Sequence, residues 1–119
     1  MLKENLPMYV YKAIVIKVYD GDTITVRIDL GFNITITERL RLFGINTPEV
    51  RGAEREEGLK SRDWLRTLIL NKEIIVKTYR DKKGKYGRYL ADIFIEQETG
   101  SVNINDWLVR ENLAERRTY

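Results

Sequence analysis

The first third of the chain is dominated by three consecutive stretches with the residue pattern of β-strands. Residues 12–19 are rich in β-branched side chains, residues 23–30 alternate apolar and polar side chains, and residues 34–43 end in the same alternation. Alternation with period two puts every second side chain on one face, which is typical of a half-buried strand. The short segments between them, 20–22 and 31–33, each contain glycine together with aspartate or asparagine, as tight turns do. The pattern therefore predicts a meander of three strands.

The rest of the sequence predicts two further strands and two helices. Residues 46–49 break the strand pattern, and small and apolar side chains at a 3.6-residue period then predict a helix over 53–70. We expect strands over 74–79 and 89–95 and a final helix over 104–111. Three asparagines mark the helix ends: Asn71 and Asn112 as left-handed stops, and Asn103 as an N-cap. The residues alone define a small, mainly β, α+β domain, and the order of elements is that of a five-stranded OB-type barrel with two to three helices.

Length and composition limit the kinds of protein and of catalysis that are possible. The 119 residues suffice for one core, so we expect a single domain over 1–119 with its core at about 12–114. The chain has neither cysteine nor histidine, which excludes disulfides, a histidine general base and histidine-ligated zinc. The first residues lack the apolar stretch of a secretory signal, and no apolar run approaches the length of a membrane span. We therefore expect no membrane association, while the compartment stays open.

Positive charge is clustered along the chain rather than spread evenly. The net charge is only +3, yet Lys and Arg outnumber acidic residues strongly over residues 77–88. The basic residues there are Lys77, Arg80, Lys82, Lys83, Lys85 and Arg88. Such clustering is the footprint of a surface that binds polyanions, and it is equally consistent with a solvated loop.

Three short segments contain the groups that phosphodiester hydrolysis needs. They are the acidic turn Asp20-Gly21-Asp22-Thr23, the segment 41–49 with its Asn46-Thr47-Pro48-Glu49, and the basic loop Lys85-Tyr86-Gly87-Arg88. They offer oxygen ligands for a hard cation, a carboxylate base and two guanidinium groups. Each also has an ordinary interpretation, as a hairpin turn, an exposed loop carboxylate or, on periodicity alone, an outward-facing Arg41. The tryptophans lie in predicted helices, where a core position is favoured over base stacking.

In order and spacing these segments, together with Asn105-Asp106-Trp107-Leu108-Val109-Arg110, resemble the staphylococcal (thermo)nuclease family. The resemblance runs from about residue 12 to residue 114 and implies an OB-type barrel with helices. It also implies roles for single residues. The metal ligands would be the Asp22 carboxylate, the Asn46 side-chain oxygen and the Thr47 carbonyl. The catalytic residues would be Arg41, Glu49 and Arg88.

Substrate contacts are expected from the basic loop. The resemblance implies that Lys85 and Tyr86 contact phosphate and nucleotide, and the charge pattern adds Lys82 and Lys83 as sources of nonspecific affinity. Asp20 is interpreted as structural, because it can cap the turn.

The function that this resemblance implies is a calcium-dependent nuclease that hydrolyses DNA and RNA with little sequence specificity and leaves 3′-phosphates. Single-stranded substrate is expected to be preferred, because an OB groove follows one strand, and we expect a monomer. The alternative is a non-catalytic OB module that binds single-stranded nucleic acid. A decayed enzyme should have lost at least one of its catalytic side chains, so the presence of Asp22, Arg41, Glu49 and Arg88 favours the enzyme.

One position departs from the commonest pattern of the family. Most members have aspartate directly before the Thr-Pro pair, and this chain has Asn46. An amide oxygen carries no formal charge, and the number of charged ligands is a main determinant of calcium affinity. We therefore expect weak calcium binding and a wider tolerance of other divalent ions.

Overall fold

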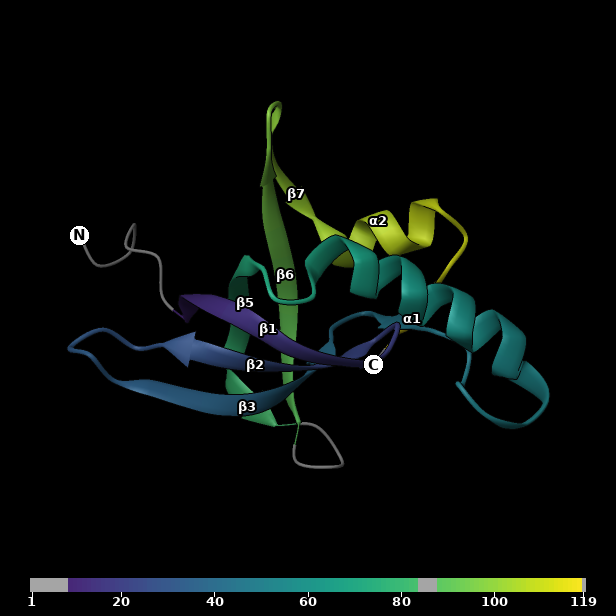
Figure 1. Cartoon of the computed structure of the whole chain (residues 1–119), viewed down its shortest axis with the longest axis horizontal. Helices are drawn as coiled ribbons and strands as arrows, with labels where there is room; N and C mark the ends of the chain where they lie inside the picture. The colour runs from purple at the N-terminus through teal and green to yellow at the C-terminus, as the bar shows by residue number, and fades with distance from the viewer. Residues whose placement is uncertain (1–8, 84–87, 119) are drawn as a thin grey trace.

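The computed structural model describes residues 9–83 and 88–118, apart from the side chains of 80–83, and shows a closed β-barrel with helices at one end (Figure 1). Strands β1 (Val10–Asp20), β2 (Thr23–Asp29) and β3 (Thr35–Leu42) form the predicted antiparallel meander. Strands β5 (Glu73–Lys83) and β6 (Tyr89–Gln97) pair with each other, and β5 also pairs antiparallel with β1. A parallel pairing of β3 with β6 closes the ring. The expected mainly β, five-stranded OB-type barrel is confirmed.

The two predicted helices are present, with ends close to those expected. A 3-10 turn, η2 (Gly52–Glu54), leads into α1 (Arg55–Ile69), and α2 is the short helix Ile104–Arg110. The three asparagines have their predicted roles. Asn71 and Asn112 have φ of 63° and 60°, and the Asn103 side-chain oxygen accepts a hydrogen bond from the Asp106 amide at 3.0 Å.

Three short strands were not expected from the sequence. They are β4 (Ile45–Asn46), β7 (Gly100–Asn103) and β8 (Glu115–Arg116). β7 continues the β6 strand as a hairpin, whereas β4 and β8 pair only with each other. Strands of two residues are too short to show a period, so they arise from tertiary pairing rather than from local pattern.

The barrel interior and the inner faces of the helices share one hydrophobic core. Leu40 and Ile93 from the barrel lie in this core with Leu65 of α1 and Leu108 of α2, and all four are fully buried. The two tryptophans, Trp64 and Trp107, pack edge to face with ring centroids 5.2 Å apart and join α1 to α2. Both tryptophans are half-buried and pack against the core, which agrees with the preference for a core position over base stacking.

Two glycines allow α1 to lie very close to the segments that carry the candidate site. A β-carbon on Gly58 of α1 would lie 2.0 Å from the carbonyl oxygen of Glu49, and one on Gly21 would lie 2.7 Å from Cγ2 of Thr47. Such distances are far below van der Waals contact. The predicted small-residue face of α1 therefore packs against the 46–50 loop and the β1–β2 turn, and it fixes both backbones.

Adding one methyl group at this contact tests how strongly the loop depends on it. Gly58→Ala should lower the free energy of unfolding by about 1–3 kcal/mol, because the new side chain overlaps a backbone carbonyl. An open helix position would instead gain up to about 1 kcal/mol from the same change. Urea unfolding measures the difference, with Thr67→Ala on the exposed side of α1 as control. A Gly58→Ala protein as stable as the parent would contradict the close approach.

Candidate active site

The site is built around the turn between β1 and β2. Asp22 lies in this turn and is only 6% exposed. Its Oδ2 atom accepts a hydrogen bond from the Thr47 amide at 2.9 Å, and its Oδ1 atom accepts one from the Thr23 hydroxyl at 3.2 Å. The first bond joins the turn to the loop after β4, so the structure brings together two segments that the sequence separates.

Asp20 stabilises the turn and has a perturbed acidity. Its Oδ1 atom accepts a hydrogen bond from the Asp22 amide at 3.1 Å, which agrees with the expected capping role. Burial raises the pKa of Asp20 from 3.8 to about 7, and the adjacent Asp22 carboxylate adds to the rise. The neighbouring Asp22 carboxylate faces the guanidinium group of Arg41.

Arg41 does not face outward into water, as its alternation with Leu40 and Leu42 suggested. It is 6% exposed, and its Nη1 atom donates to the carbonyl oxygens of Leu42 at 3.1 Å and Ile45 at 3.0 Å. The chain turns back over the end of β3 into β4, so the outward face of the strand is covered there. The carbonyl oxygens exposed by that turn supply the acceptors that a buried guanidinium needs.

The same guanidinium group connects two of the predicted metal ligands. Its Nη2 atom donates to Oδ1 of Asn46 at 2.9 Å, and its Nη1 atom lies 3.4 Å from Oδ2 of Asp22. Oxygen atoms of Asp22 and Asn46 thus converge on one cationic position. Thr47 is also buried, and among the described residues its hydroxyl oxygen has no hydrogen-bond partner.

Glu49 lies beside this cluster rather than within it. Its side chain is exposed and makes no hydrogen bond or ion pair within residues 9–83 and 88–118, while its amide donates to Oε1 of Glu54 at 3.1 Å. With Thr47 and Pro48 it lines a polar cleft of about 370 Å³. The carboxylate is therefore accessible to solvent and to a ligand.

Arg88 joins the cluster from the position directly before β6. Its Nη1 atom donates to the Thr23 hydroxyl at 3.1 Å, and Thr23 in turn donates to Asp22. The parallel pairing of β3 with β6 brings Arg88 alongside the end of β3. Lys85 and Tyr86 lie outside the described residues, as do the side chains of Lys82 and Lys83.

Two side chains support the site without having been predicted. Thr23 contacts both Asp22 and Arg88, and its place in the Asp-Gly-Asp-Thr turn was the available signal. Asn105 is 1% exposed, donates to the carbonyl oxygens of Phe43 and Ala91, and accepts from the Ile93 amide. These hydrogen bonds connect α2 to the end of β3. In the sequence, an asparagine in the first turn of a short helix looks the same whether it is buried or on the surface.

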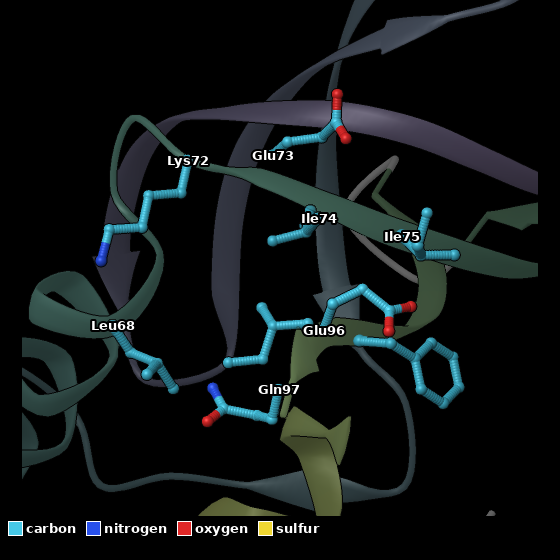
Figure 2. Close-up of a pocket in the computed structure, with 9 residues that line it drawn as sticks. Leu68, Lys72, Glu73, Ile74, Ile75, Glu96 and Gln97 are labelled. Atoms are coloured by element: carbon cyan, nitrogen blue, oxygen red, sulfur yellow. The ribbon is translucent and has the colours of Figure 1, made fainter. Parts of the chain in front are cut away.

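A second groove lies at the other end of the β5–β6 hairpin (Figure 2). Aliphatic side chains of Leu68, Ile74 and Ile75 form much of its wall, and the charged groups of Lys72 and Glu73 point away from Ile74. None of the predicted site residues lines it. The candidate chemistry therefore belongs to the β1–β2 turn and the 46–49 loop.

Comparison with known proteins agrees with the fold. Residues 39–119 match the family model described as staphylococcal nuclease homologue. A thermonuclease of Staphylococcus hyicus is 30% identical over 88% of this chain and 59% of its own length. An uncharacterised protein of Methanocaldococcus jannaschii is 30% identical over 87% of this chain and 58% of its own length. An endonuclease of Bacillus subtilis is 31% identical over 87% of this chain, which corresponds to 9% of that protein.

The chain belongs to the staphylococcal nuclease family. It spans a little under three fifths of the length of the thermonucleases and of the archaeal protein that it matches. No helix in the described part of the chain has the length and apolar character needed to cross a bilayer.

The buried shell around Arg41 makes a prediction about stability. Arg41→Lys should lower the free energy of unfolding by about 2 kcal/mol, because an ammonium group cannot reproduce the fork that reaches both carbonyl oxygens and Asn46. Arg62→Lys, at a half-exposed pair with the neighbouring Asp63, is the matched control and should change stability by less than about 0.5 kcal/mol. Equal losses in thermal or urea unfolding would mean that Arg41 has no special structural role.

Proposed function

We propose that this chain is a calcium-dependent nuclease that hydrolyses phosphodiester bonds of DNA and RNA with little sequence specificity. The observation that carries the proposal is the convergence of buried Asp22 and Thr47 and exposed Asn46 on one cluster that also contains Arg41 and is contacted by Arg88. Oxygen donors next to two guanidinium groups suit a reaction centre that is anionic and needs a hard cation. Membership of the nuclease family supports the same reaction class.

The proposed ligands are oxygen atoms, which calcium prefers, although only the Asp22 carboxylate among them carries a negative charge. Asp22 and Asn46 direct oxygen atoms to the same Arg41 guanidinium group, which keeps the two side chains close to each other. We assign the Asp22 carboxylate, the Asn46 side-chain oxygen and the Thr47 carbonyl as protein ligands. The described residues contain no cluster of three or more acidic, histidine or cysteine side chains suited to a metal, so the protein shell would supply little negative charge. A bound calcium ion would polarise the phosphodiester and lower the barrier to attack by water.

The two arginines supply the positive charge for the transition state. Phosphoryl transfer concentrates negative charge on the non-bridging oxygens, and a planar guanidinium group binds two of these oxygens at once. Arg41 is held rigidly by backbone acceptors and Arg88 by Thr23, so both are oriented before substrate binds. Their contribution should therefore appear in turnover more than in ground-state binding.

We assign Glu49 as the residue that acts on the attacking water. Its accessible carboxylate can orient that water and accept its proton, and the contact of Gly58 with the Glu49 carbonyl keeps its backbone in position. Water attacks the phosphorus atom and the P–O5′ bond breaks, so that O5′ leaves as a hydroxyl and the other product keeps a 3′-phosphate. Recognition through phosphate explains low sequence specificity, and an OB groove favours single strands. We further propose that residues 1–119 act as one domain and as a monomer.

Metal dependence tests this proposal directly. The protein should hydrolyse single-stranded DNA with added calcium, and a chelator should abolish the activity. Glu49→Gln should lower turnover by at least about 100-fold while leaving the unfolding transition unchanged, since general acid–base catalysis contributes about that much. Undiminished cleavage in chelator would exclude the metal. Binding of oligonucleotide with no cleavage under any divalent ion would favour the non-catalytic binding module.

Asn46 allows a sharper test of the metal ligands. Asn46→Asp adds a full negative charge to the proposed shell, so we expect calcium to bind the free protein on the order of tenfold more tightly. Calorimetric titration of both forms measures the difference, and Gln97→Glu at the exposed end of β6 adds the same charge away from the site as a control. An unchanged or weaker affinity would remove Asn46 from the set of ligands and would indicate that its role is to hold Arg41.

A further inference from the structure

We propose that the outer face of β1, β2 and β3 carries a second stretch of bound single-stranded nucleic acid, held by Lys17, Arg27 and Arg39. This surface, the basic track, begins beside Arg41 and continues away from the candidate active site. The proposal rests on the proposed function, because it assigns the path that a long substrate takes beyond the reacting phosphate.

Strand register puts the three cations of the track together. Thr25 of β2 pairs with Lys17 on one side and with Arg39 on the other, so these residues form one row across three strands. Arg27 lies two residues further along β2 and is a diagonal neighbour of both. Diagonal neighbours in antiparallel sheets are about 7–8 Å apart. Figure 1 shows the three strands lying side by side in this part of the barrel.

The same register connects the track to the candidate active site. Arg39 and Arg41 are two residues apart on β3, so both lie on the face opposite to buried Leu40. Two residues along a strand span about 6.6 Å. The row that contains Arg41 also contains Thr23, whose hydroxyl accepts from Arg88. A single strand of nucleic acid that reaches Arg41 and Arg88 therefore lies close to Arg39 as well.

The cations of the track are available to a ligand. Lys17, Arg27 and Arg39 are all exposed, and none makes a hydrogen bond or ion pair within the described ranges 9–83 and 88–118. Thr25 and Thr37 lie between them on the same face and add hydroxyl groups that can donate to phosphate. Elsewhere, Arg62 and Arg116 are each paired with an aspartate.

Two acidic groups of this face lie beside Arg27, at the end of the track away from Arg41. Asp29 faces outward on β2 and uses Oδ1 to accept from the Gly31 amide, and Glu73 pairs with Ile14 on β1. The side chain of Glu38 lies on the opposite face, with Leu40. Positive charge therefore fades with distance from Arg41. A polyanion that extends from the active site is the ligand that this gradient fits.

The track accommodates one strand of single-stranded nucleic acid. Lys17 and Arg39 are two strand spacings apart, which is about 10 Å. The track thus offers a narrow basic strip on a sheet whose register shifts between Val15 and Lys17, and no helix of the described residues belongs to this strip. Phosphate contacts from lysine and arginine would add affinity without adding base specificity.

The test compares two charge-matched double variants. Lys17→Gln with Arg39→Gln removes two cations from the track, and Lys60→Gln with Lys72→Gln removes two exposed cations elsewhere. Anisotropy of labelled oligothymidylate in chelator measures binding without cleavage, over a series of salt concentrations. A trinucleotide is short enough to engage only the active site, and a strand of about 15 nucleotides also covers the track.

We expect the track variant to bind the long strand more weakly. The slope of log K against log salt concentration should become shallower by about 1.4, which corresponds to the loss of two phosphate contacts on single strands. Its affinity for the trinucleotide, and both affinities of the control variant, should be unchanged. During hydrolysis of the long strand KM should rise while kcat stays within about twofold.

Three results would contradict the proposal that the track binds nucleic acid. They are an equal loss of affinity for trinucleotide and long strand, the same loss in the control variant, and a loss on duplex DNA as large as that on single strands. If the proposed nuclease activity is absent, the experiments give a different result. A length-dependent loss of binding, with no cleavage by the parent protein under any divalent ion, would support the track and reject the enzyme.

Discussion

The buried guanidinium group of Arg41 is the interaction on which the rest of the site depends. A charge removed from water is tolerated only where acceptors surround it. Here those acceptors are the carbonyl oxygens of Leu42 and Ile45, the Asn46 side chain and the Asp22 carboxylate. Because they come from β3, β4 and the β1–β2 turn, one side chain holds together every backbone segment that carries a proposed metal ligand.

Much of the fold follows from local pattern in the sequence. The meander, the two helices and the roles of Asn71, Asn103 and Asn112 could be predicted, because period, turn residues and caps act over a few positions. Closure of the barrel through β3 and β6 is a tertiary pairing of segments far apart in the chain. No local pattern encodes it, and the expectation of a barrel came from the order of elements and from resemblance to a family.

The candidate site was less predictable than the fold. Its residues could be named from three motifs, but the environment of Arg41 could not, because alternation along β3 cannot reveal that β4 folds back over the strand end. The bridging hydroxyl of Thr23 and the buried amide of Asn105 depend in the same way on non-local contacts. Sequence patterns identified which groups are present, and the three-dimensional packing decides which atoms each of them faces.

The parallel pairing of β3 with β6 also has a consequence for the order of folding. Arg41 belongs to the meander, which forms from neighbouring strands. Arg88 directly precedes β6, which joins β3 only when a long stretch of chain, including α1, has been enclosed. Loop closure of that size is entropically costly and slow compared with hairpin formation. The two guanidinium groups therefore meet only in the closed barrel, and partly folded chains contain an incomplete site.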